Sequence, residues 1–109
     1  MEDTTMTKLR QRMIDDMNLA GLSSRTQGEY IRAVRQLVKI YKVSPDRISE
    51  EQVRRYFVDL QRDKDIAMGT FIVKYHGIKF FFFRTLGLDW GLFTKKKFKN
   101  PAKNVYHTP

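Results

Sequence analysis

The sequence of 109 residues contains no cysteine and no long apolar segment. Without cysteine, neither a disulfide framework nor a thiolate metal site is possible, which fits a reducing cytoplasm. The longest purely apolar run, Phe80 to Phe83, is far too short to cross a bilayer. The opening segment, MEDTTMTKLRQR, is charged and lacks the apolar core of a signal peptide. We therefore expect a cytoplasmic protein that is not inserted in a membrane.

Residue patterns typical of catalysis or metal binding are also absent. The two histidines, His76 and His107, lie far apart, and no pair of acids has a diagnostic spacing. No glycine-rich loop of the kind that holds phosphates is present. Tyr106 would need an arginine and histidine set behind it to act as a nucleophile, and the sequence does not provide one. The sequence thus predicts no catalysis, no metal and no cofactor.

Basic charge, by contrast, is abundant, with a formal net charge of +9. Residues 21–43 carry five cations and one acid (net +4), and residues 67–109 carry eight cations and one acid (net +7). The two remaining segments, 1–20 and 44–66, each have a net charge of −1. An excess of this size favours nucleic acid or an anionic membrane surface as the partner. Its concentration in two segments indicates two separate contact elements.

Apolar spacing predicts two helices in the first part of the chain. The first covers about residues 4–19, with a stripe through Leu9, Met13 and Met17, and ends before Gly21. The second covers residues 24–42, with its core stripe at positions 30, 34, 37, 38 and 41. The pattern Ser24-x-x-Gln27 predicts a capping box at its start. Gly28 in its first turns suggests the close approach of another backbone.

Two further helices are expected after a turn at Ser44-Pro45-Asp46. The third covers about residues 49–62 and opens with a second capping-box pattern, Ser49-x-x-Gln52. The fourth covers about residues 68–86 and is apolar on nearly all sides around Phe80–Phe83, which predicts that it is the central helix. Residues 88–93 are expected to fold back on the core. The fold class is therefore all-α: one compact bundle of four main helices, followed by a basic C-terminal linker.

Cations lie on the outward faces of the second and fourth helices, where they could bind DNA. Lysine and arginine neutralise phosphates and release counterions, and arginine also recognises guanine in the major groove. The outward-facing candidates are Arg25, Arg32, Arg35 and Lys39 on the second helix and Thr70, Lys74 and Lys79 on the fourth. Further on, the run Lys95, Lys96 and Lys97 could contact the DNA backbone.

The order of these signals resembles the N-terminal core-binding, SAM-like domain of the tyrosine recombinases, the phage-integrase family. The resemblance covers about residues 5–103. It rests on Leu22-Ser23-Ser24-x-Thr26-x-x-x-Tyr30, Ile48-Ser49-x-Glu51-x-Val53-x-x-Tyr56, Thr70-Phe71-x-x-x-Tyr75-x-x-Ile78-Lys79-x-Phe81-Phe82 and Asn100-Pro101-Ala102. The chain departs from the family pattern at His76-Gly77 and in the strongly basic segment Lys95–Lys99.

The resemblance implies that this domain forms one half of a clamp around double-stranded DNA, with the second and fourth helices facing the major groove. It adds Thr26 to the candidate DNA contacts. It further implies a core-binding domain over residues 1–99 and a linker, residues 100–109, to a catalytic domain that is absent from this sequence. We accordingly expect a piece of a bacterial or phage recombinase, associated with the nucleoid, which binds DNA without cutting it and oligomerises only on DNA as part of the full-length protein.

Three alternatives remain open at this stage. A helical bundle of this kind could bind proteins instead of DNA. A basic, phenylalanine-rich helix could bind a membrane surface, provided that Phe80–Phe83 are exposed. A standalone enzyme is the third alternative.

Overall fold

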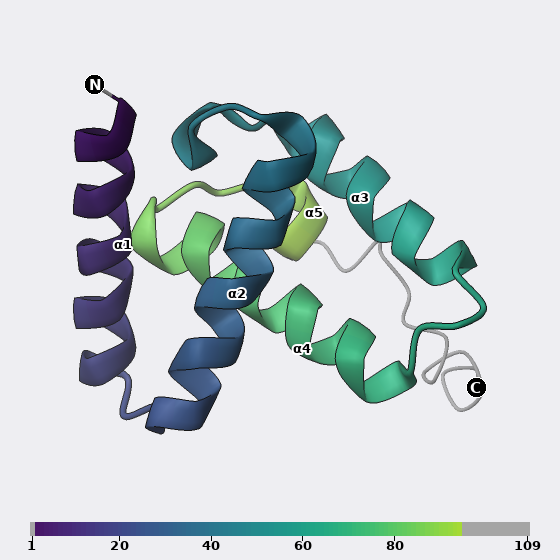
Figure 1. Cartoon of the computed structure of the whole chain (residues 1–109), viewed down its shortest axis with the longest axis horizontal. Coiled ribbons are helices and arrows are strands. Elements are labelled where there is room, and N and C mark those ends of the chain that lie inside the picture. The colour runs from purple at the N-terminus through teal and green to yellow at the C-terminus, as the bar shows by residue number, and fades with distance from the viewer. Residues whose placement is uncertain (1, 95–109) are drawn as a thin grey trace.

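The computed structural model describes the backbone of residues 2–94 and the side chains of residues 6–93. This part of the chain is all-α and has no strand (Figure 1). The main helices are α1 (Glu2–Leu19), α2 (Ser24–Tyr41), α3 (Glu50–Arg62) and α4 (Met68–Lys79). Shorter elements are η1 (Pro45–Arg47), the π-helix η2 (Phe80–Thr85) and α5 (Gly91–Thr94). The predicted all-α bundle of four main helices is confirmed, while the predicted linker lies outside the described residues.

Serine caps hold the starts of α2 and α3. In α3 the predicted capping box is confirmed, because the Gln52 N–H donates to Ser49 Oγ (3.1 Å) and the Ser49 N–H donates to Gln52 Oε1 (2.9 Å). In α2 the predicted capping residue was wrong by one position. Ser23, not Ser24, is the N-cap, and its Oγ accepts from the Thr26 N–H (3.2 Å). Gln27 instead donates to the Leu22 carbonyl (2.9 Å), which ties α2 to the preceding turn.

The fourth predicted helix is continuous but changes its geometry. From Phe80 to Thr85 the backbone widens into a π-helix, and the Leu86 N–H donates five residues back to the Phe81 carbonyl (2.9 Å). Ile78, Phe81 and Phe82 are buried, with at most 1% of each residue exposed. This end of the helix is therefore the centre of the core, as the sequence predicted.

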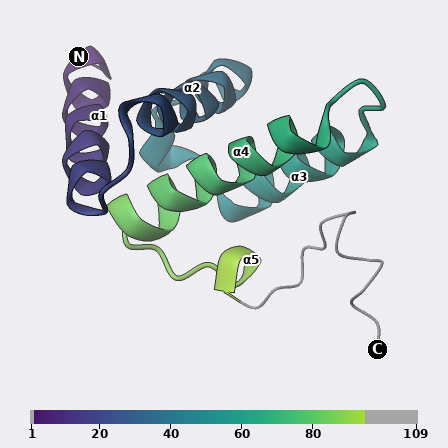
Figure 2. The same ribbon diagram turned by 90° about the horizontal axis from the view of Figure 1, so that it is seen from below.

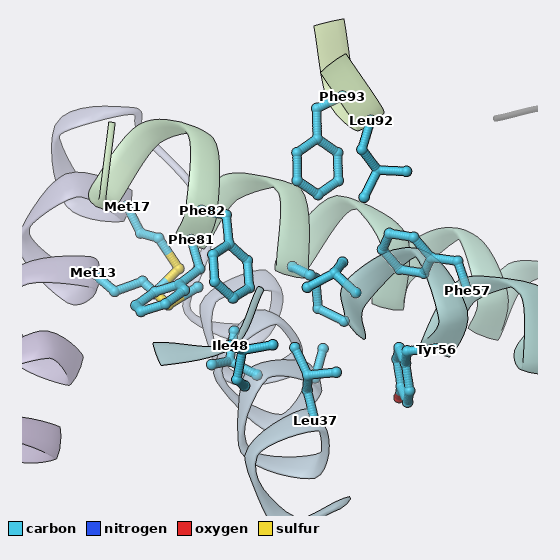
Figure 3. Packing of buried hydrophobic residues seen from close by; sticks show 14 residues of the cluster. Met13, Met17, Leu37, Ile48, Tyr56, Phe57, Phe81, Phe82, Leu92 and Phe93 are labelled. Carbon is cyan, nitrogen blue, oxygen red and sulfur yellow. The ribbon is translucent and has the colours of Figure 1, made fainter. Parts of the chain in front are cut away.

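The core joins all of the main helices around these phenylalanines. Figure 3 shows Met13 and Met17 of α1 lying against Phe81. On the other side, the Phe57 ring of α3 lies 5.2 Å from the Tyr75 ring of α4. Trp90 stacks on Phe82 with 4.8 Å between ring centroids, which confirms that the segment after η2 folds back on the core.

This returning segment is also fixed by a side chain from α3. A carboxylate oxygen of Glu50 accepts a hydrogen bond from the Leu92 N–H (2.9 Å). Figure 2 shows α5 lying beside α4, on the far side from α2. The segment therefore covers the face of α4 opposite to α2.

Helices α2 and α4 form the most extensive helix–helix contact in the bundle and cross each other in Figure 1. The crossing depends on Gly77, because a Cβ at this position would lie 2.9 Å from the Cα of Tyr30. The sequence pointed to Gly28 for such a close approach, and this was wrong, since a Cβ there would meet nothing within 4 Å. Gly77 thus sets how closely α4 approaches α2.

Candidate nucleic-acid interface

The outward face of α2 carries a row of basic side chains. Arg25, Arg32 and Lys39 follow one another at seven-residue intervals, about two helical turns, and therefore lie along one side of the helix. Arg35 flanks this row, and all four residues are exposed. Arg25 forms an ion pair with Glu29 (3.7 Å), whereas the structure gives no ion pair to Arg32, Arg35 or Lys39 within the described residues. The middle and the end of the row therefore present positive charge to solvent.

Lys74 brings α4 into the same surface. Its ammonium donates a hydrogen bond to Gln36 Oε1 of α2, so the two helices are joined at this point. Burial lowers the pKa of Lys74, and the nearby charge of Arg32 lowers it further. Gln36 lies one turn after Arg32 on α2, so its bond to Lys74 brings Lys74 to the side of α2 that carries Arg32. A polyanion at this position would offset the repulsion between the two cations.

The two threonine candidates are placed differently. Thr70 is exposed and lies one turn before Lys74 on the same side of α4, because residues four apart share a helix face. Thr26 is only half exposed, and its hydroxyl oxygen accepts a hydrogen bond from Ser23 Oγ (3.1 Å). Thr70 therefore extends the surface along α4, whereas Thr26 takes part in the cap of α2.

Lys79 does not lie with Lys74. Lys79 lies five positions after Lys74, which corresponds to a rotation of about 140° around the helix. Lys79 lines a separate hollow of about 360 Å³, together with Tyr30, His76 and Phe83. Its charge therefore faces the turn between α1 and α2. Lys95, Lys96 and Lys97 lie outside the described residues, and their role stays a prediction.

A larger groove lies between α1 and α2, with a volume of about 700 Å³. Arg32, Arg35 and Lys39 line one side, and Arg10 of α1 lines the other. The sequence had not pointed to Arg10, although its place next to the apolar stripe through Leu9 and Met13 was a usable signal. The groove thus adds a fourth basic residue to the three that α2 contributes.

The membrane alternative required Phe80–Phe83 to be exposed, and this is met only by Phe83 (38% exposed), since Phe80 is half-buried and Phe81 and Phe82 (1% and 0% exposed) form the core. Among the described residues, no helix is long and apolar enough to span a membrane. Residues 2–94 also contain no group of three or more histidines and acids that could hold a metal ion. The exposed cations of α2 and the half-buried Lys74 of α4 therefore remain the candidate site.

Comparison with known proteins defines the class of this domain. Residues 9–92 match the family described as "Phage integrase, N-terminal SAM-like domain", and the chain belongs to this family. The match begins in α1 and ends in α5, so it includes every helix that forms the core and the basic surface. No solved structure matches the chain significantly.

A curated relative extends the comparison to a complete protein. It is "Putative integrase/recombinase y4qK" of Sinorhizobium fredii, which is 36% identical to this chain over 89 residues. The match covers 82% of this chain but only 29% of the relative. The chain therefore spans less than a third of the length of the protein that it matches.

Proposed function

We propose that this domain binds double-stranded DNA through one face formed by α2 and α4, as the core-binding half of an integrase or recombinase. The observation that carries the proposal is the hydrogen bond from Lys74 of α4 to Gln36 of α2, because Gln36 lies one turn after Arg32 and next to the exposed Arg35. Phosphate contacts from such cations position a protein on the duplex without reading sequence. Arginine side chains on α2 could add contacts to guanine when the helix lies in the major groove.

The geometry of the crossing supports this function. Gly77 lets α4 approach α2 closely, and Lys74 of α4 then reaches Gln36 of α2. The surface of α3 carries less unpaired positive charge than the α2–α4 face. Its exposed arginines lie among acids such as Glu51, which pairs with Arg54 (3.8 Å). A polyanion should therefore prefer the α2–α4 face to α3.

We further propose that strand cleavage and rejoining belong to another part of the parent protein. Within this sequence the domain would supply affinity and position, and any oligomer would form only when full-length copies assemble on DNA. Association with the nucleoid would follow from this binding. Incubation with a nicked DNA substrate should yield no covalent protein–DNA product; such a product would contradict this part of the proposal.

The test is fluorescence anisotropy with a labelled DNA duplex at low salt. The double variant Arg32→Ala/Arg35→Ala should bind at least about tenfold more weakly than the wild type, because it removes two charge-assisted contacts. Arg54→Ala/Arg55→Ala is the matched control, since it removes the same charge from exposed positions of α3. Equal binding by the wild type and the Arg32/Arg35 variant would refute the assignment of the face.

A further inference from the structure

The groove between α1 and α2 has a composition that DNA binding does not require. Its floor is apolar and incompletely covered, with Leu9, Ile31 and Val38 only half-buried. Arg10 and Arg35 line its two sides, and none of the lining residues among positions 6–93 is acidic. A phosphate backbone would contact the basic rim, but it has no apolar side chains with which to fill the floor. The floor therefore fits an occupant that carries both acidic and apolar groups.

We propose that this groove binds an acidic amphipathic helix of a partner protein. Amphipathic helices enter grooves by placing apolar side chains at positions i, i+4 and i+7 on the floor, and acidic side chains beside them would meet the arginines.

The charge of the groove excludes an occupant from this chain's own C-terminal segment. Residues 95–109 carry five lysines and no acid. The basic rim would repel this segment, whereas an acidic partner is complementary to the rim. Electrostatic complementarity thus points to a second protein of opposite charge.

Binding of such a helix would regulate the domain. Arg32, Arg35 and Lys39 line the groove and also belong to the proposed DNA-binding face. A partner that pairs with them would neutralise the charges that attract DNA, so the two ligands would compete. This regulatory step rests on the proposed DNA binding, whereas binding of the helix itself does not.

The experiment uses three synthetic peptides, each fourteen residues long by design. One carries leucines at i, i+4 and i+7 among glutamates, a second has serine in place of leucine, and a third has glutamine in place of glutamate. The protein has no cysteine, so a single Thr7→Cys substitution on the groove allows one environment-sensitive dye to be attached. Gln11→Cys is the control site, because Gln11 is exposed on the same helix but does not line the groove.

The acidic amphipathic peptide should bind saturably and change the dye signal at position 7 but not at position 11. Each control peptide should bind about tenfold more weakly or worse, since one loses apolar burial and the other loses charge pairing. Equal binding by the serine peptide would show a general polyanion surface and overturn the proposal. Absence of saturable binding, or the same signal at both dye positions, would also overturn it.

These titrations contain no DNA, so they succeed or fail independently of the proposed function. In a separate titration, the amphipathic peptide should release a labelled duplex from the wild-type protein. Peptide binding without release of the duplex would refute the competition. Failure of the wild-type protein to bind the duplex before any peptide is added would instead refute the proposed function.

Discussion

Gly77→Ala should separate the two helices on which the basic face depends. The new Cβ would lie 2.9 Å from the Cα of Tyr30 and 3.3 Å from its Cβ. The first of these atoms belongs to the backbone, so a side-chain rotation cannot remove the clash. Overpacking of this kind costs about 1–3 kcal/mol, and the helical preference of alanine returns up to about 1 kcal/mol. The net result should be a loss of up to about 2 kcal/mol of unfolding free energy.

Gly28→Ala is the matched control within α2. A Cβ at Gly28 meets nothing within 4 Å, so only the helical preference changes, and stability should rise by about 0.5–1 kcal/mol. Urea unfolding followed by circular dichroism measures the unfolding free energy of both variants. In thermal unfolding, a change of about 1 kcal/mol corresponds to about 4–8 °C in Tm. The reasoning about the crossing would be refuted if Gly77→Ala were as stable as Gly28→Ala.

Three other substitutions test the core and the interface. Thr85 is 1% exposed and its hydroxyl has no partner among the described residues, so Thr85→Val should raise unfolding free energy by about 1 kcal/mol in a urea titration; an unchanged or lower value would contradict this. Lys74→Met should weaken DNA binding in an anisotropy titration without lowering Tm, because burial already disfavours the charge of Lys74; a large fall in Tm would show that its bond to Gln36 holds the fold. Burial raises the pKa of Tyr75, so this group contributes stability below the unfolded pKa of about 10 that is lost as pH rises through the folded value. Tyr75→Phe should therefore reduce the fall in Tm between about pH 9 and pH 11. An identical fall in both proteins would show that ionisation of Tyr75 does not contribute to the loss of stability.

Much of the fold follows from local patterns in the sequence. The apolar stripes predicted all four main helices to within two residues at most boundaries, because each stripe buries one face of its helix. The π-helix could not be predicted in the same way. Residues 80–83 are all phenylalanine, so a wider turn leaves the same apolar pattern and changes only which rings point inward.

Two local features were ambiguous for physical reasons. Ser23 and Ser24 are both good N-cap residues, and only the observed hydrogen bond to the Thr26 N–H selects Ser23. Gly28 and Gly77 both lie within helices, but only the relative placement of α2 and α4 shows that Gly77 faces another backbone. Close approach is a property of two helices together, so one helix's sequence cannot reveal it.

The candidate site was partly predictable. The seven-residue spacing of Arg25, Arg32 and Lys39 already places them on one face of a helix. The same periodicity would have separated Lys79 from Lys74, and this signal was present in the sequence. The sequence places Arg10 next to the apolar stripe of the first helix, but only the packing of α1 against α2 shows that Arg10 lines the groove between them.

The salt dependence of DNA binding tests the central proposal most directly. The logarithm of the association constant falls with the logarithm of salt concentration by about 0.9 for each phosphate contact. Arg32→Ala/Arg35→Ala should therefore make this slope shallower by about 1.8, while Arg54→Ala/Arg55→Ala should leave it unchanged. An equal change of slope in both variants, or no change in either, would contradict a DNA-binding face on α2 and α4.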